Sequence, residues 1–236
     1  MVILCGGKGM RLRPITDTIP KALVTLAGKP IINHIIDKYS EKGINQYLLC
    51  IGHKGHMIRA IFKNKSNITF IDSGEDASML KRIFDTKDYV DENIIVGYCD
   101  TIADLDFNDL MNKHKNSGKL LTMVLAEIIS PFGIVQHNSN QINSFQEKPV
   151  FDYYIGTFVI NKKAFQHITP DLLFIESNEG LVNFFQKLVN MKEINSYKYN
   201  GKQLTFNTNS EKEAAEKGII GFYTMREENE DNNNGN

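Results

Sequence analysis

The chain opens with MVILCGGKGMRL at residues 1–12, a short apolar segment followed by three glycines within four positions. Residues 1–5 are apolar and partly β-branched, which is typical of a buried strand that ends at Gly6 and Gly7. Glycine lets the backbone approach a ligand without a side chain in the way. Consecutive backbone N–H groups in such a loop form a concave site for anions. A tight strand-to-helix turn gives the same pattern, so the loop alone leaves both interpretations open.

Basic residues follow the loop. Arg11 and Arg13 place two guanidinium groups beside it, and this group pairs well with phosphate oxygens. Prolines at positions 14 and 20 stiffen the next segment, so we expect Lys21 on a rigid loop. A fixed lysine beside such a cradle can neutralise a triphosphate as it is cleaved. The segment matches neither GxxxxGK[ST] nor GxGxxG, whose third glycine is missing, and this disfavours a dinucleotide-binding dehydrogenase.

Strand and helix signals alternate over the first half of the chain. Apolar runs predict strands at residues 1–5, 46–51, 68–71, 94–98 and 120–127, and helical spacing predicts helices at 30–42, 56–62, 78–84 and 106–116. This order indicates an α/β fold: a Rossmann-like, mixed and mainly parallel sheet flanked by helices.

The second half changes character. Residues 133–136, 141–147 and 154–160 are predicted as short strands of a small antiparallel excursion, and 162–167 and 179–191 as helices. With no repeat and no long linker, residues 1–225 are predicted as one catalytic domain. Residues 226–236, REENEDNNNGN, carry no apolar side chain and are expected to be a solvated, mobile tail.

Composition excludes several classes of protein. The 236 residues are 42% hydrophobic and 23% charged, so the chain is neither fibrous nor wholly disordered. Lys and Arg number 27 against 28 Asp and Glu, which weighs against binding nucleic acid by bulk charge. No apolar run approaches the roughly 20 residues of a membrane span. The cysteines, three in number and without a CxxC motif, suggest free thiols in a reducing cytoplasm: Cys5, Cys50 and Cys99.

Several ordered motifs together resemble one enzyme family. Residues 6–32, GGKGMRLRPITDTIPKALVTLAGKPII, are similar to the signature of nucleotidyltransferases that couple an NTP to a phosphorylated acceptor. The GIN of residues 43–45, the GHKG of 52–55 and the FQEKP of 145–149 resemble the glucose-1-phosphate cytidylyltransferase branch. The resemblance implies a nucleotide-diphospho-sugar transferase type of fold, CTP as substrate, Mg²⁺ or alternatively Mn²⁺ as cofactor, and a homo-oligomer.

The resemblance also implies roles for individual residues. Arg11 and Lys21 are the implied catalytic residues, the first on the β- and γ-phosphates and the second on the α-phosphate. The implied nucleotide-binding residues are Cys5, Gly6, Gly7, Lys8, Gly9, Ser78 and Asp100. The implied acceptor-binding residues are Lys148, Tyr154 and Glu179, and the implied metal ligands are Asp100 and Asn207.

Four departures from the family pattern bear on substrate and activity. The GDG of the family is Cys99-Asp100-Thr101 here, and its second metal-binding Asp is Asn207. Its TGG loop is replaced by Asp76-Ala77-Ser78-Met79, and its sugar-reading NGG by Tyr154-Ile155-Gly156-Thr157. Tyr and Ile fill space that sugar hydroxyls would need, and unpaired buried polar groups reject a polyol. These changes favour a non-sugar acceptor such as phosphoglutamine in capsule or surface polysaccharide modification. A sugar-1-phosphate nucleotidyltransferase and a catalytically silent homologue are the alternatives.

Each assigned side chain also has a purely structural interpretation. Arg11 would form a surface ion pair, and Lys21 would be a solvated loop lysine. Asp100 would be a turn residue. The remaining three would be helix-capping or hairpin-surface residues: Lys148, Glu179 and Asn207.

Overall fold

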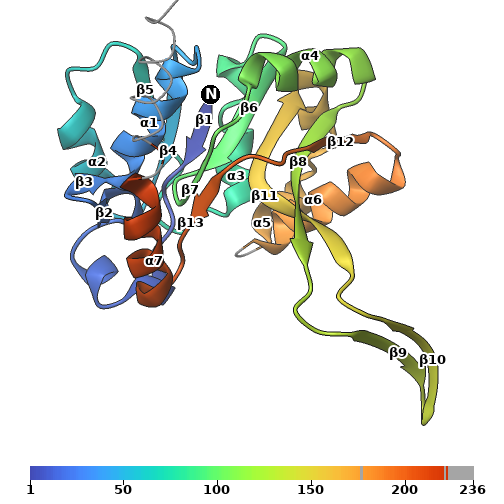
Figure 1. Ribbon diagram of the computed structural model, residues 1–236. Helices are drawn as coiled ribbons and strands as arrows, with labels where there is room; N and C mark the ends of the chain where they lie inside the picture. The colour runs from blue at the N-terminus through green and yellow to red at the C-terminus, as the bar shows by residue number, and fades with distance from the viewer. Residues whose placement is uncertain (176–177, 221, 223–236) are drawn as a thin grey trace, which may run out of the picture.

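A seven-stranded sheet forms the centre of the protein, in the order β12-β8-β11-β6-β1-β4-β5 (Figure 1). The computed structural model describes residues 1–175, 178–220 and 222. Neighbouring strands are parallel, except that β11 is antiparallel to both β6 and β8. The predicted mixed, mainly parallel sheet is therefore confirmed. The strands are β1 (Val2–Leu4), β4 (Tyr47–Ile51), β5 (Ile68–Asp72), β6 (Asn93–Tyr98), β8 (Leu121–Ile129), β11 (Val150–Asn161) and β12 (Ile194–Lys198).

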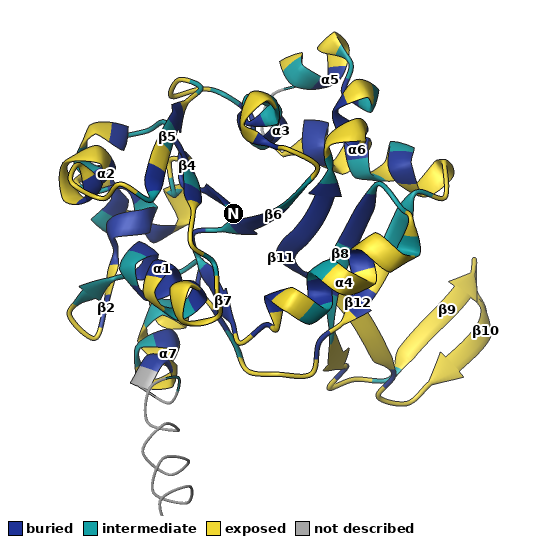
Figure 2. Cartoon of the chain, turned by 90° about the horizontal axis from the view of Figure 1, so that it is seen from above, coloured by how far each residue is buried: buried dark blue, intermediate teal, exposed yellow. Residues whose placement is uncertain are grey.

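Helices cover both faces of this sheet, and the alternation of side chains along each strand explains why. In β1, Ile3 faces one apolar cluster, whereas Val2 and Leu4 face the other. Figure 2 shows the central strands buried between the helical layers. The first cluster is covered by α1 (Ile31–Glu41), α2 (Gly55–Phe62), α4 (Phe107–Ser117) and α7 (Asn209–Ile220), and the second by α3 (Met79–Phe84), α5 (Pro170–Phe174) and α6 (Glu179–Asn190).

The direction of strand progression changes beside β1. The strands β4 and β5 continue from β1 on one side, and β6 lies on its other side. All four strands run parallel, so their carboxyl ends meet at one edge of the sheet. In open α/β sheets, ligands bind at this edge, where the strand order reverses.

The small antiparallel excursion is shorter than the sequence predicts. Strands β9 (Ile134–Asn138) and β10 (Gln141–Gln146) form a hairpin that extends away from the body, and both are exposed throughout (Figure 1). Residues 154–160 do not belong to this excursion. They form part of β11, which lies in the central sheet between β6 and β8. Their apolar, continuous sequence matches a strand that is buried on both faces.

Other elements differ in type from the sequence prediction or carry too weak a signal for one. Residues 162–167 form a 3-10 helix, η5 (Lys162–His167), where a helix was predicted. The unpredicted elements include several short 3-10 helices, the edge strand β12, the short helix α5, and two small antiparallel pairs, β2 (Thr25–Leu26) with β3 (Lys29–Pro30) and β7 (Thr101–Ala103) with β13 (Gln203–Thr205).

Some predictions from composition can be compared with the described residues. All three cysteines are buried and free. No helix within the described part of the chain is long and apolar enough to cross a bilayer. The predicted tail, residues 226–236, lies outside the described residues.

Candidate active site

A cavity of about 570 Å³ opens at the carboxyl edge of the sheet, beside the point where the strand order reverses. Three walls come from segments that follow β1, β5 and β6, and a fourth comes from residues far along the chain. The lining residues that carry polar or charged side chains are Lys8, Arg11, Lys21, Glu75, Asp76, Ser78, Arg82, Tyr98, Cys99, Asp100, Asn178 and Asn207.

The three glycines of the first loop have three different surroundings. A Cβ on Gly6 would lie 2.4 Å from a guanidinium nitrogen of Arg82, so this glycine makes room for an arginine. A Cβ on Gly7 would meet no atom within 4 Å, because Gly7 faces open space beside the cavity. Gly9 has φ +62 and lies against Thr16 and Lys21. The loop therefore offers an unobstructed backbone to a ligand mainly at Gly7.

The loop also offers unpaired backbone donors. Among the described residues, none accepts a hydrogen bond from the backbone N–H of Gly7, Lys8 or Gly9. Unpaired N–H groups beside a cavity attract an anion. This is the arrangement that the sequence pattern predicts for a phosphate-binding loop.

Lys21 lies at the centre of a polar cluster at the base of the cavity. It begins the 3-10 helix η3 (Lys21–Leu23), and its side chain is 13% exposed. Its Nζ is 2.6 Å from Asp100 Oδ2 and donates to Asn207 Oδ1 at 3.0 Å. Arg11 donates to the same Asn207 oxygen at 2.8 Å. Lys21 is thus held in place, which excludes the interpretation as a solvated loop lysine.

Asp100 and Asn207 meet because two short strands pair. Strand β7 begins directly after Asp100, and β13 ends two residues before Asn207. The hydroxyls of Thr101 and Thr205 are 3.1 Å apart across this pair, and the Phe206 N–H donates to the Asp100 carbonyl at 3.3 Å. A two-stranded ladder therefore fixes a side chain from residue 207 beside one from residue 100.

The oxygen atoms of this cluster fit a divalent cation in kind. Asp100 Oδ2 and Asn207 Oδ1 converge on one cation, which is the Lys21 ammonium. Mg²⁺ is commonly bound by one or two carboxylates together with substrate phosphates and water. No group of three or more His, Cys, Asp and Glu side chains suited to a metal exists among the described residues, so a nucleotide would have to complete the coordination.

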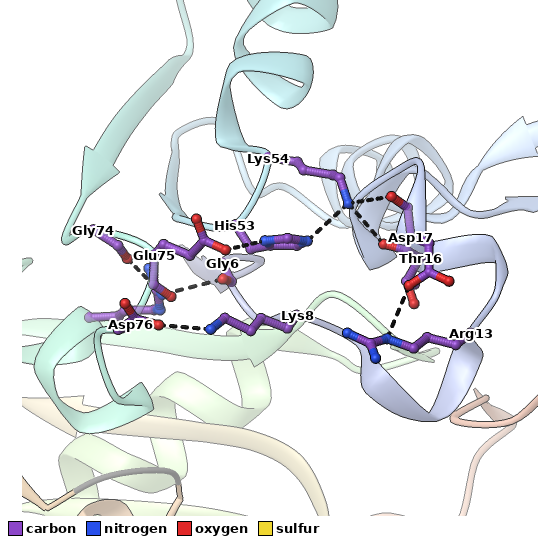
Figure 3. A network of polar contacts seen from close by, with 11 residues as sticks. Gly6, Lys8, Arg13, Thr16, Asp17, His53, Lys54, Gly74, Glu75 and Asp76 are labelled. Atoms are coloured by element: carbon purple, nitrogen blue, oxygen red, sulfur yellow. Dashed lines mark hydrogen bonds and ion pairs between the residues drawn. The ribbon is translucent and has the colours of Figure 1, made fainter.

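The loop that precedes α3 is tied to the first loop by one ion pair and to the segment after β4 by a histidine contact (Figure 3). Lys8 Nζ is 2.8 Å from Asp76 Oδ1, and this pairing raises the pKa of Lys8 and lowers that of Asp76. His53 Nδ1 is 2.6 Å from Glu75 Oε1. Lys54 donates to the carbonyls of residues 16 and 17, at 3.1 and 2.8 Å. These contacts join the segments that follow β1, β4 and β5 to one another.

Of the predicted site residues, most lie together at this cavity. Ser78 lines it and caps α3, since its hydroxyl accepts from the Lys81 N–H. The other predicted residues that line it are Gly6, Gly7, Lys8, Gly9, Arg11, Lys21, Asp100 and Asn207.

Four predicted residues do not line the cavity. Cys5 is buried beneath the first loop, and burial raises the pKa of its thiol well above the ordinary value. Lys148 is exposed at the base of the hairpin, and Glu179 is the first residue of α6. Tyr154 is half-buried and packs edge-on against Tyr98, which does line the cavity, with ring centroids 6.2 Å apart.

Two residues that line the cavity, Arg82 and Tyr98, were not predicted from the sequence as site residues. Arg82 lies in the short helix α3, MLKRIF, beside a second basic residue, Lys81, and apolar side chains that pack into the core. Tyr98 ends a buried strand, and burial raises the pKa of its hydroxyl. One signal for Arg82 was available: helical spacing places this charged residue on the buried face of the helix, where charged side chains are rare.

Comparisons with known proteins agree with this geometry. The family described as nucleotidyl transferase matches residues 1–220. The chain belongs to this family. A "Probable glucose-1-phosphate cytidylyltransferase" of Bacillus subtilis (strain 168) is 32% identical, over 77% of this chain and 82% of that protein. The glucose-1-phosphate cytidylyltransferase of Salmonella typhimurium (strain LT2) is also 32% identical, over 72% and 78%.

The fold is also found in solved structures. HddC from Yersinia pseudotuberculosis superposes with a TM-score of 0.71 at 21% identity, over 92% of this chain and 98% of that one. As a member of the family, the protein is a nucleotidyltransferase, and the cavity at the carboxyl edge is its candidate active site.

Proposed function

We propose that the protein is a CTP-dependent cytidylyltransferase that transfers CMP from CTP to a phosphorylated small molecule. The observation that carries this proposal is the convergence of the glycine loop, Arg11, Lys21 and Asp100 on one cavity. The preference for CTP rests on the relatives that are named as cytidylyltransferases.

The proposed reaction is a single in-line displacement. A phosphate oxygen of the acceptor attacks the α-phosphorus of CTP, the bond from that phosphorus to the bridging oxygen of the β-phosphate breaks, and pyrophosphate leaves. The loop amides and Arg11 bind the part that departs, and Lys21 faces the charge that develops on the α-phosphate. No nucleophilic side chain is required.

Asp100 and Asn207 would hold Mg²⁺, or alternatively Mn²⁺, which would supply positive charge to the phosphate oxygens. The same two oxygens contact the Lys21 ammonium in the structure. An ammonium has three N–H donors, so Lys21 would donate to an α-phosphate oxygen from the place where Asp100 and Asn207 hold it.

The proposed acceptor is a non-sugar phosphate, such as phosphoglutamine, in capsule or surface polysaccharide modification. Support comes from Tyr154, which occupies the place of the sugar-reading stretch and packs, half-buried, against Tyr98. Lys148 and Glu179 remain proposed acceptor contacts, although neither lines the cavity of its own chain. We further propose that the protein acts as a homo-oligomer and without nucleic acid or membrane partners.

A second candidate is glucose-1-phosphate cytidylyltransferase itself, which the two named relatives favour. A catalytically silent homologue is the third. The support for this candidate is Asn207, because a neutral amide binds a metal ion less strongly than a carboxylate would at the same position.

A matrix of NTPs and acceptor phosphates, read out by release of pyrophosphate in Mg²⁺, tests the three together. We expect turnover with CTP and a non-sugar phosphate. Turnover with CTP and glucose 1-phosphate alone would favour the second candidate. Silence in every combination, with Mn²⁺ included, would favour the third.

A further inference from the structure

Arg82 is a buried arginine beside the candidate active site. Arg82 is 3% exposed, and no described carboxylate forms an ion pair with it. Its guanidinium donates instead to backbone carbonyls, through Nη1 to Ile51 at 2.5 Å and through Nη2 to Gly6, Gly74 and Glu75 at 3.2, 2.9 and 3.1 Å. A buried charge is costly unless it is well hydrogen-bonded, so these carbonyls are what keeps it in place.

These four carbonyls belong to three segments that leave the sheet at the same edge. Gly6 follows β1, Ile51 ends β4, and Gly74 and Glu75 follow β5. Two of the segments, the one after β1 and the one after β5, form opposite parts of the cavity lining. The planar guanidinium of Arg82 therefore connects the segment after β1 with the segment after β5, and both of these segments line the cavity.

Two glycines make room for this side chain. A Cβ built on Gly6 or on Gly52 would lie 2.4 Å from Arg82 Nη1. Gly52 does not line the cavity, so its lack of a side chain serves the arginine and not a ligand. The packing of the guanidinium between these two residues leaves it little freedom to turn.

The carbonyl contacts also set the direction of backbone donors. In a trans peptide the C=O of one residue and the N–H of the next point in opposite directions. With the Gly6 carbonyl turned toward Arg82 and toward the His53 N–H, the Gly7 N–H points away from both. The Glu75 carbonyl fixes the Asp76 N–H in the same manner.

We propose that Arg82 is a positioning residue, whose guanidinium clamps the loop after β1 to the loop before α3 and so aims the amides that hold the nucleotide's polyphosphate. The inference rests on the proposed function for its ligand. In this proposal Arg82 does not contact the reacting atoms.

Binding of Mg²⁺·CTP and of tripolyphosphate, measured by calorimetry, tests the clamp. Arg82→Lys keeps the charge but cannot reach all four carbonyls, and we expect both affinities to fall by about tenfold or more, because each lost charge-assisted hydrogen bond matters. The kcat at saturating CTP is expected to change much less than KM. Arg59→Lys, at an exposed arginine of α2 that contacts Asp72, is the matched control and should bind as the wild type does.

Gly52→Ala provides a second variant outside the cavity. It should weaken CTP binding in the wild-type background, because the added Cβ displaces the guanidinium. It should add no further loss to Arg82→Ala, in which the side chain is gone. Hydrogen exchange of the His53 amide, which donates to the clamped Gly6 carbonyl at 3.0 Å, should be faster in the unliganded variants than in the wild type.

The outcomes separate the two proposals. Folded Arg82→Lys and Gly52→Ala proteins that bind CTP as tightly as the wild type, or losses that multiply in the double variant, would overturn the clamp and leave the function standing. A wild type that binds no NTP would contradict the function, and the exchange measurement would still decide the clamp: unchanged rates would refute it.

Discussion

Lys21 is the side chain on which the proposed chemistry depends most. It is nearly buried and contacts both Asp100 and Asn207. We predict that Lys21→Ala lowers kcat by about a hundredfold or more, because it removes a fixed donor to developing charge. The thermal midpoint should stay close to that of the wild type. Lys113→Ala, at an exposed helix lysine that pairs with Asp109, is the control, and wild-type turnover in Lys21→Ala would show that the role is wrongly assigned.

The buried thiols give a second prediction for single residues. Burial raises the pKa of Cys50 and of Cys99 to about 12. Because only the thiolate reacts, alkylation by iodoacetamide in the folded protein should stay slow, without a rise in rate between pH 7 and pH 9. In urea the same residues should react faster as the pH rises through the ordinary thiol pKa. Rapid native labelling, mapped to these residues by mass spectrometry, would contradict their burial.

Side-chain chemistry was largely predictable where it followed backbone pattern. The glycine loop, Arg11, Lys21 and Asp100 were predicted together, because each lies in or next to a motif whose order along the chain is fixed. Arg82 was not, because its contacts are carbonyls from three separate segments, and no local pattern records where those carbonyls point.

Among the elements, β11 contains an irregularity that shapes the site. Its pairing with β8 shifts register between Tyr154 and Phe158, and Gly156 between them has φ +86. A Cβ there would lie 2.9 Å from the Tyr98 ring, which lines the cavity. The register shift thus lets the tyrosine ring pack against the strand.

We predict that Gly156→Ala destabilises the protein by about 2–3 kcal/mol, through backbone strain together with the clash with Tyr98. Gly118→Ala is the matched control. Gly118 also has a positive φ, of 64, but has open space around it, so its cost should be only about 1 kcal/mol. Urea unfolding of the two variants measures the difference, and equal costs would argue against a close Tyr98 contact.

Element boundaries were predicted well where a strand is a continuous apolar run and poorly where it is not. The central strands are continuous apolar runs, whereas β12, with the sequence INSYK, is a partly polar edge strand. Asn207 was predicted as a site residue only from the resemblance to the family. What brings it to Asp100 is the pairing of β7 with β13, two strands of three residues each that hydrophobic periodicity cannot detect.

At the scale of the whole molecule, the hairpin of β9 and β10 is exposed throughout and carries no Asp, Glu, Lys or Arg. An isolated two-stranded hairpin is marginal in water, and this one exposes Ile142 and Phe145, each at 66%. We predict that the hairpin contributes to the homo-oligomer. Light scattering should give a multiple of 26.8 kDa for the wild type.

Phe145→Asp should lower that mass, and Met10→Asp, at an exposed apolar residue distant from the hairpin in sequence, should not. A monomeric wild type at high concentration would contradict the predicted assembly.

Titration calorimetry of the wild-type protein with CTP, UTP, GTP and ATP in Mg²⁺ asks most directly whether the amides and cations at the end of β1 hold a nucleotide triphosphate. The account predicts a heat of association that is strongest for CTP and that weakens when Arg11 is replaced by Met. The absence of heat with all four nucleotides would contradict it.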